Sequence, residues 1–217
     1  MSDITIGTAL PRTTASRRYT AVAIVLHWAI GLAILFQLAM GLYMVQYADS
    51  LDPGVLFAAY QLHKSIGLTI LMLVLVRIAW RLFHSPPPLP ADLPRLEKRA
   101  AHGTHLVLYA GMLAMPLTGW AMVSASVYNI PTVLFGLMPW PHLPVLATLH
   151  DKAPVEDAFK AIHAYIGFGL IAFVGLHASA ALRHQIFKHD DVLWRMLPLW
   201  RRPRAASLER ISPCEPS

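Results

Sequence analysis

Four long apolar stretches constrain this chain more than any other feature. They run from Thr20 to Met44, Phe57 to Phe83, His102 to Ser124 and Lys160 to Phe187. A helix needs about 20 predominantly apolar residues to cross the hydrocarbon core of a bilayer, and each stretch is that long. Only 14% of the 217 residues are charged, against roughly 25% in soluble domains. The sequence therefore predicts an integral membrane protein with four spans, the first of which is too long for a signal-peptide core and is expected to be retained.

Basic residues are distributed unevenly along the chain. Lysine and arginine are concentrated before the first stretch, between the second and third, and after the fourth. The other two connecting segments are mainly acidic, with Lys152 set against Asp49, Asp52, Asp151, Glu156 and Asp157. By the positive-inside rule, both termini are predicted to be cytoplasmic. The net charge of +6 is then an orientation signal, and we expect no binding to nucleic acid.

Four spans with both ends on one side predict an all-α, up-down-up-down four-helix bundle. We expect a cytoplasmic N-terminal segment (1–19), a transmembrane domain (20–198) and a disordered cytoplasmic tail (199–217). The inner connection contains HSPPPLPADLP, which is typical of an extended, semi-rigid linker. The second outer segment, 125–159, is apolar but broken by prolines. It is expected to lie along the outer surface as a cap over the bundle.

Four histidines lie inside the apolar stretches, where an ionisable side chain is costly unless it has a partner. His163 and His177 are fourteen residues apart, which places them about 21 Å apart on nearly the same helix face. His27 lies in the inner half of the first stretch and His63 near the outer start of the second. Depth therefore pairs His27 with His177 and His63 with His163. Haem is the cofactor that takes two neutral imidazoles in an apolar interior, so we predict two haems.

Small residues follow these histidines at a fixed spacing. Three of the four have glycine four residues further on, at Gly31, Gly67 and Gly167, and the fourth has Ala181. Position i+4 lies on the same helix face, so a missing side chain there leaves room for a flat macrocycle. The alternative is that glycine is common in membrane helices because it permits close packing. We favour the interpretation that these positions make room for haem.

Other polar residues near the spans are further candidates for the site. Arg77 lies fourteen residues after His63, at the inner level, where it could bind a haem propionate or a quinone; the alternative is that it snorkels to the inner surface. Lys64 could pair with outer propionates or attract small anions. His102 and His105 open the third stretch, either as interfacial residues or as contacts to a propionate or a quinone head group.

Two observations exclude other classes of protein. The single cysteine, Cys214, lies in the polar tail, so the chain has no CxxCH motif for covalent haem, no disulfide framework and no thiolate cluster. A transporter that relays protons or metal ions would need acidic residues within the spans. There are none from residue 20 to 44 or from 57 to 83.

At these histidines the chain resembles the bacterial cytochrome b561 family, whose relatives include the cytochrome b subunits of hydrogenases. The matching pieces are RYTAVAIVLHW, LHKSIG followed by VRIAWRL, AHGTHLVLYAGMLAMPLTGW, and IHAYIG with GLHASAAL and a closing RMLP. They cover roughly Arg18 to Pro198. The resemblance implies a multi-pass cytochrome of the bacterial inner membrane that holds two non-covalent haem b groups. It implies that the axial ligands are His27, His63, His163 and His177.

Members of this family exchange electrons with the quinone pool, and one branch passes the electron of superoxide to ubiquinone. The resemblance thus implies a carrier of electrons between a small periplasmic-side one-electron donor and ubiquinone or menaquinone, with superoxide as one candidate donor. The alternative is a membrane-anchor cytochrome b subunit that serves a periplasmic dehydrogenase or hydrogenase. The residues alone leave both interpretations open.

Overall fold

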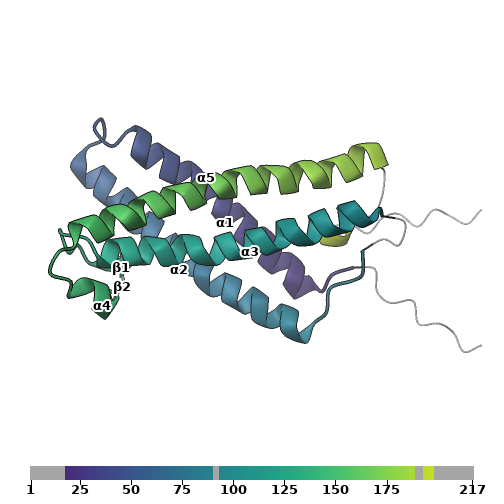
Figure 1. Cartoon of the computed structure of the whole chain (residues 1–217), viewed down its shortest axis with the longest axis horizontal. Coiled ribbons are helices and arrows are strands. Elements are labelled where there is room, and N and C mark those ends of the chain that lie inside the picture. Colours follow the sequence, from purple (N-terminus) through teal and green to yellow (C-terminus); the bar gives the residue numbers. More distant parts are fainter. Residues whose placement is uncertain (1–17, 90–92, 189–192, 198–217) are drawn as a thin grey trace, which may run out of the picture.

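Four long helices dominate the computed structural model, which describes residues 18–89, 93–188 and 193–197 (Figure 1). They are α1 (Ala21–Gln46), α2 (Pro53–Phe83), α3 (Arg95–Ser124) and α5 (Ala153–Arg183). The 26 residues of the shortest, α1, span about 39 Å at 1.5 Å per residue. This exceeds the roughly 30 Å hydrocarbon core of a bilayer. All four helices are long and apolar enough to cross a membrane, which confirms the predicted all-α membrane bundle.

Three of the four long helices, α2, α3 and α5, begin earlier than the apolar stretches that predicted them. Helix α2 starts at Pro53, where the Asp52 carboxylate accepts hydrogen bonds from the backbone N–H groups of Gly54 and Val55. Helix α1 is capped in the same way by Thr20. Such caps satisfy backbone donors that the first helical turn leaves unpaired. Apolar composition marks the part of a helix that lies in hydrocarbon, whereas the caps mark where the helix itself begins.

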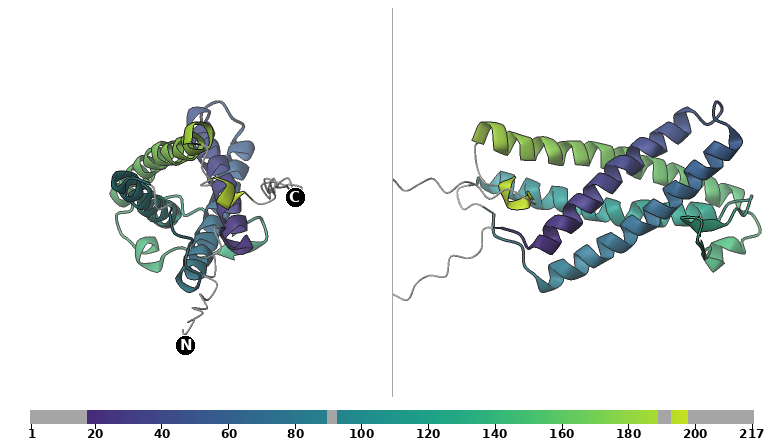
Figure 2. Two further views of the ribbon diagram at one scale, coloured as in Figure 1. Left: turned by 90° about the vertical axis from the view of Figure 1, so that its right-hand side faces the viewer. Right: turned by 180° about the vertical axis from the view of Figure 1, so that it is seen from behind.

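The four helices surround a common long axis (Figure 2). Helix α1 crosses α2 obliquely, and the hydrophobic core lies between them, around Ile30 and Val74, which are almost fully buried. Met112 of α3 and Val174 of α5 pack against this cluster. Elsewhere most large apolar side chains are exposed, as expected where a helix faces lipid.

The two ends of the described chain meet at one end of the bundle. A short 3₁₀ turn (Trp194–Met196) folds back against α1, where the Trp28 indole N–H donates to the carbonyl of Met196 at 2.7 Å. Arg18 donates to the carbonyl of Leu197 at 2.8 Å. We call this the inner end, after the orientation that the charges predict, and the end with the α1–α2 connection the outer end. The predicted N-terminal segment and tail lie almost wholly outside the described residues.

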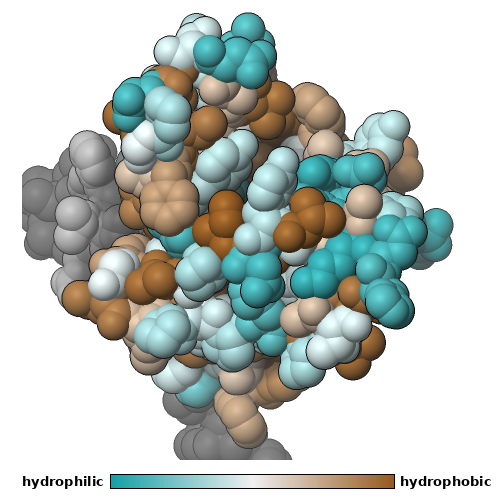
Figure 3. All heavy atoms as spheres, turned by 90° about the vertical axis from the view of Figure 1, so that its left-hand side faces the viewer, coloured by the Kyte–Doolittle hydropathy of each residue, from teal (hydrophilic) through white to brown (hydrophobic). Residues whose placement is uncertain are grey.

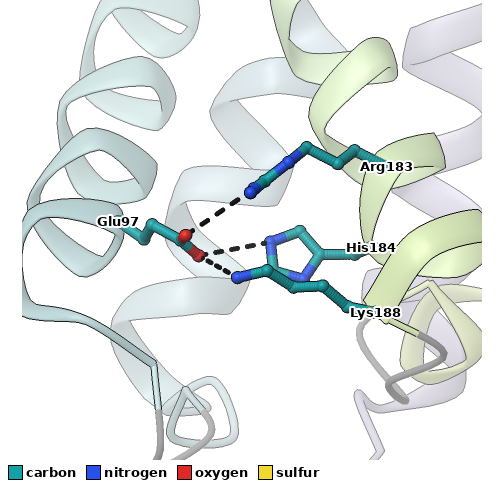
Figure 4. Close-up of polar contacts among 4 residues, drawn as sticks. All are labelled: Glu97, Arg183, His184 and Lys188. Atoms are coloured by element: carbon teal, nitrogen blue, oxygen red, sulfur yellow. Dashed lines mark hydrogen bonds and ion pairs between the residues drawn. The ribbon is translucent and has the colours of Figure 1, made fainter.

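An ion cluster joins α3 to the last turn of α5 at the inner end (Figure 4). Glu97 lies 2.6 Å from Lys188, 3.6 Å from Arg183 and 3.9 Å from His184. Lys188 closes a π-helical segment (His184–Lys188) that follows α5. Glu97 is in the first turn of α3 and Arg183 in the last turn of α5, where each charge also opposes its helix dipole favourably.

The second outer segment forms a hairpin and a short helix. Strands β1 (Thr132–Leu134) and β2 (Met138–Trp140) pair antiparallel, and helix α4 (Pro144–Ala147) follows. The turn places Phe135 and Gly136 at positive φ angles of 49° and 73°. We expected this segment to cap the end of the bundle. It lies instead beside the outer parts of α2 and α3 (Figure 2). Ser65 of α2 and Ser124 of α3 accept hydrogen bonds from its backbone there.

Candidate cofactor site

Helices α1 and α5 bring His27 and His177 together in the inner half of the bundle. Their ring centroids lie 6.1 Å apart, with an angle of 74° between the ring planes. Helix α1 runs from the inner end outward and α5 from the outer end inward. Residues far apart in the sequence therefore meet at the same depth.

Helices α2 and α5 bring His63 and His163 together in the outer half. Their ring centroids lie 6.5 Å apart, and the rings are inclined by 71°. His163 and His177 belong to the same helix, so fourteen residues at 1.5 Å each separate the two pairs by about 21 Å. The structure thus brings together both pairs that depth predicted.

The spacing within each pair fits a haem. An imidazole nitrogen lies about 2 Å from a metal it binds, so two imidazoles on opposite sides of one ion have ring centroids roughly 6 Å apart. A steep angle between the rings is compatible with this, since each ring can turn about the bond axis. Within the described ranges, no three His, Cys, Asp or Glu side chains gather to hold a bare metal ion. Haem needs only the two axial ligands from the protein, because the macrocycle supplies the other four.

The second nitrogen of His163 has a hydrogen-bond partner that the sequence did not reveal. His163 Nδ1 lies 3.1 Å from Thr118 Oγ1, and the Thr118 hydroxyl donates to the carbonyl of Ala114 at 2.8 Å. That hydroxyl can accept an N–H from His163 while donating its own proton to the helix. Histidines that bind metals usually donate their other N–H in this way, which fixes the ring. Nε2 of His163 is then left for a metal.

His63 has a different environment. Its Nδ1 is buried and has no hydrogen-bond partner among the described residues. Gln37 of α1 donates from Nε2 to the carbonyl of His63 at 2.8 Å, and the other end of this amide, Oε1, is likewise buried and without a partner in the described part of the chain. Both atoms belong to the contact between α1 and α2 beside the outer pair. Gln37 is a second candidate that the sequence analysis missed.

Arg77 is held by hydrogen bonds to neighbouring helices of the bundle. Its guanidinium donates to the carbonyl of Ala23 at 2.9 Å and to the Tyr109 hydroxyl at 3.0 Å. A third nitrogen, Nη2, lies 3.5 Å from Nδ1 of His27. These bonds tie the arginine to α1 and α3. Arg77 places a positive charge beside the inner pair.

A cavity of about 400 Å³ opens at the inner end beside this arginine. Its lining includes Arg77, Tyr109, Ala23 and Trp80. The Trp80 indole donates to the Thr20 hydroxyl at 3.0 Å, joining α2 to the start of α1. The cavity thus combines aromatic walls with hydrogen-bond donors, and Arg77 connects it to His27.

The two histidines at the start of the third stretch occupy different places. The His105 ring lies 5.3 Å from the ring of His177, and its Nδ1 lies 2.7 Å from the carbonyl of Ala101. His105 is thus part of the inner site. His102 is exposed, with its Nδ1 2.6 Å from the carbonyl of Lys98.

Glycines from neighbouring helices lie against the outer pair. A Cβ at Gly119 of α3 would lie 3.1 Å from Cε1 of His163, and one at Gly41 of α1 would lie 3.6 Å from Cε1 of His63. Of the i+4 glycines that the sequence suggested, Gly31 has open space beside it, whereas a Cβ at Gly167 would meet Met115 at 3.2 Å. Close approach to the imidazoles therefore depends on facing helices as well as on the ligand helix itself.

The two lysines near the outer histidine pair differ in whether a carboxylate lies beside them. Lys64 Nζ lies 3.3 Å from the carbonyl of Pro131 in the outer segment, with no acidic partner in the described ranges. Lys160 forms ion pairs with Glu156 at 3.0 Å and Asp157 at 3.6 Å. Of these two lysines, only Lys64 therefore carries a positive charge that no carboxylate offsets.

The outer segment contributes one further titratable group. Burial lowers the pKa of His142, and the positive charges of Lys64 and Lys152 lower it further, against a hydrogen bond with the backbone of Val123. This histidine is accordingly neutral at pH 7. It adds no charge to the surface around Lys64.

Similarity to known proteins extends over nearly the whole chain. A family model described as prokaryotic cytochrome b561 matches residues 18–199. Cytochrome b561 homolog 2 of Escherichia coli is 32% identical over 186 residues, covering 85% of this chain and 94% of the relative. Cytochrome b562 of Cereibacter sphaeroides is 31% identical, covering 86% and 96%. A protein of Yersinia pestis named probable superoxide oxidase CybB is 27% identical, covering 84% and 97%.

Proposed function

Because the chain belongs to the prokaryotic cytochrome b561 family, and is thus a multi-pass bacterial membrane cytochrome of the b type, we propose that it carries electrons between a periplasmic donor and membrane quinone. The observation that carries this proposal is the stacking of two histidine pairs at two depths of one bundle. A redox centre near each surface is what electron transfer across a membrane requires.

We assign one haem b to each pair. His63 and His163 are the ligands of the outer haem, and His27 and His177 those of the inner haem. Bound haem supplies an iron that takes up and releases one electron at a time. The protein contributes the axial imidazoles, holds His163 through Thr118, and keeps the positive charge of Arg77 beside His27.

We assign quinone binding to the cavity at the inner end. Reduction of a quinone leaves negative charge on its oxygens, which cationic and hydroxyl donors stabilise. Arg77 and Tyr109 supply such donors on the cavity wall, and Trp80 offers an aromatic surface for the ring. The same donors could instead bind propionates of the inner haem. These two roles of Arg77 are separable, because only quinone binding responds to quinone concentration.

We propose superoxide as the donor, with electrons entering at the outer end. The resemblance to the Yersinia protein named probable superoxide oxidase supports this choice. The unbalanced charge of Lys64 beside His63 supports it as well, since a local positive charge raises the concentration of a small anion. The predicted cytoplasmic placement of both termini puts this end in the periplasm.

Purified protein tests these assignments directly. A pyridine haemochrome assay should give two non-covalent haems per chain, and a stoichiometry of one would contradict the four-ligand assignment. Superoxide should then reduce the haems, and added ubiquinone should reoxidise them. If superoxide failed while quinol still reduced the haems, the chain would fit the anchor-subunit alternative better, with a periplasmic dehydrogenase or hydrogenase as its partner.

A further inference from the structure

Most of the second outer segment, residues 125–150, has unusually few charged residues for a surface connection. No Asp, Glu, Lys or Arg occurs between residues 125 and 150. The other outer connection is only a few residues long and holds Asp49 and Asp52. Connecting segments in water are normally polar. Seen from the outer end, hydrophobic residues lie among hydrophilic ones and no uniformly polar surface forms (Figure 3).

The tip of the β1–β2 hairpin exposes large apolar side chains. Leu137 is 88% exposed, Phe135 54% and Met138 53%. These residues sit on a tight turn, in which the N–H of Leu137 donates to the carbonyl of Leu134 at 2.8 Å. The turn therefore fixes the backbone while its side chains contact little of the protein. Three neighbouring exposed apolar side chains on an ordered turn indicate a surface that is covered in the cell.

Hydrogen bonds place this hairpin at the depth of the outer histidine pair. The N–H of Phe135 donates to Ser65 Oγ at 2.9 Å, and the N–H of Val133 donates to Gln61 Oε1 at 3.2 Å. Ser65 lies two residues beyond His63 and twelve residues into α2, roughly 18 Å from the start of that helix. The hairpin therefore runs beside a membrane span and does not project from its end.

The polar residues of α2 that hold the hairpin face away from His63. Gln61 and Ser65 are each two residues from His63, which places them about 200° around the helix from it. Gln61 accepts from Val133 and donates to the carbonyl of Pro131 at 2.9 Å. Backbone polar groups at membrane depth must find partners within the protein. These two side chains satisfy hairpin groups that the short ladder leaves unpaired.

An apolar recess continues from the hairpin onto α2. A cavity of about 380 Å³ is lined by Phe57, Ala58 and Leu62 of α2 and by Val133 and Phe135 of the hairpin, together with the polar residues Gln61 and Ser65. Phe57 and Val55 are themselves half-exposed on α2, a helix that spans the membrane. The hairpin surface is thus continuous with a surface that contacts lipid.

We propose that the β1–β2 hairpin is inserted into the outer leaflet, with Phe135, Leu137 and Met138 among the acyl chains and one acyl chain in the recess against α2. Lipid fits better than a protein partner because residues 125–150 include no Asp, Glu, Lys or Arg to orient a partner, and because the hairpin borders a lipid-facing helix. This inference does not depend on the electron donor or acceptor proposed above.

Spin labelling in nanodiscs tests the insertion. Cys214 is the chain's one cysteine, so Cys214→Ser provides a background for the single variants Leu137→Cys and Met138→Cys. Each is labelled with a nitroxide, and its collision rates with apolar oxygen and with a water-soluble nickel chelate are measured by EPR. Leu75→Cys, at a half-exposed site within the α2 span, is the lipid control. Asp49→Cys, in the charged outer connection, is the water control.

Insertion predicts that both hairpin labels resemble Leu75→Cys, with fast oxygen collisions and slow nickel collisions. If both resembled Asp49→Cys, the hairpin would lie in water and the proposal would be overturned. Because only purified protein and lipid are present, a surface reserved for a protein partner would also give the water result. The haem spectrum of each labelled variant shows that it is folded, and agreement between two positions guards against a local effect of one label.

Discussion

Thr118 Oγ1 lies 3.1 Å from Nδ1 of His163, so that a hydroxyl on α3 controls the ring of a proposed haem ligand on α5. The same hydroxyl donates to the carbonyl of Ala114, which leaves its oxygen as the acceptor for the imidazole N–H. Such a bond holds the ring orientation and increases the basicity of the ligand. We therefore expect Thr118, which is not one of the proposed ligands, to influence the proposed outer haem.

Thr118→Val should remove this bond while keeping the side-chain shape. We expect a cost of about 1 kcal/mol in stability together with a changed low-spin EPR signal and midpoint potential for one haem only. Thr69→Val is the matched control, because Thr69 also donates to a carbonyl four residues back but has no histidine beside it among the described residues. If both variants left the EPR signal and potential unchanged, the role of Thr118 would be rejected.

The two histidine pairs should behave as two separable sites. His63→Ala and His163→Ala should each abolish the same spectral component, and His27→Ala and His177→Ala the other. Loss of one axial imidazole leaves the iron held from one side only. Low-temperature reduced-minus-oxidised spectra of the four variants provide the measurement. If His27→Ala and His163→Ala removed the same component, the pairing by depth would be wrong.

The pairing was predictable from the sequence because a membrane span ties residue number to depth. Once orientation is set, His27 and His177 can meet only in the inner half, and Arg77 must lie at their level. Depth says nothing about which face of one helix meets the next. The contacts of Thr118, Gln37 and Gly119 depend on helix rotation and crossing, so the sequence did not reveal them.

The ion pairs of Lys160 and the position of the proline-rich segment were not predicted from the sequence, for different reasons. Lys160 forms its ion pairs because α5 begins at Ala153, before the apolar stretch. The helix therefore places Glu156 one turn before the lysine. The apolar stretch alone begins at Lys160 and leaves Glu156 in the preceding connection. The docking of the proline-rich segment depended on Gln61 and Ser65, which are polar residues on the side of α2 away from His63.

Gly119 provides a steric test of the outer site. A Cβ there would lie 3.1 Å from Cε1 of His163, so Gly119→Ala must displace the imidazole or the helix. We expect a loss of about 1–3 kcal/mol and a weakened or altered outer haem spectrum. Gly169→Ala, whose Cβ would meet nothing within 4 Å, should leave the spectrum unchanged and should not lower the stability, because alanine is favoured over glycine within a helix. Equal spectra for the two variants would show that the ring does not need this space.

Gly31 tests whether the i+4 spacing makes room for a macrocycle. A Cβ at Gly31 meets nothing within 4 Å among the described residues, so the leucine side chain of Gly31→Leu starts in open space. If the inner haem occupies the space beside His27, the variant should fold with about one haem per chain in place of two. Gly175→Leu, which is likewise unobstructed, is the control and should keep both. Full haem content in Gly31→Leu would show that the space beside Gly31 is not needed for haem.

Arg77 and Arg81 should differ in their effects on the inner end. Arg77 lies 3.5 Å from His27 Nδ1, so Arg77→Gln removes a positive charge from the inner site and should lower the midpoint potential of that haem. Arg81 lies with its guanidinium carbon 5.7 Å from the centre of the Tyr109 ring, and Arg81→Gln should change the potential less. A rise in the KM for quinone in Arg77→Gln would indicate quinone contact as well. An unchanged potential and KM would reject both roles of this arginine.

Steering of superoxide by Lys64 can be separated from general effects of lysine replacement. Lys64 has no carboxylate partner in the described ranges, whereas Lys160 is balanced by Glu156 and Asp157. We therefore expect Lys64→Gln to slow haem reduction by superoxide at low salt, and Lys160→Gln not to slow it. The difference should close at high salt, because exposed charges are screened beyond about 8–10 Å at physiological ionic strength. Stopped-flow measurements of haem reduction at two salt concentrations give the comparison.

If Lys64→Gln reacted as fast as wild type at low salt, the proposed steering by this lysine would be wrong. A slower rate that persisted unchanged at high salt would point to a structural effect through the hydrogen bond to Pro131.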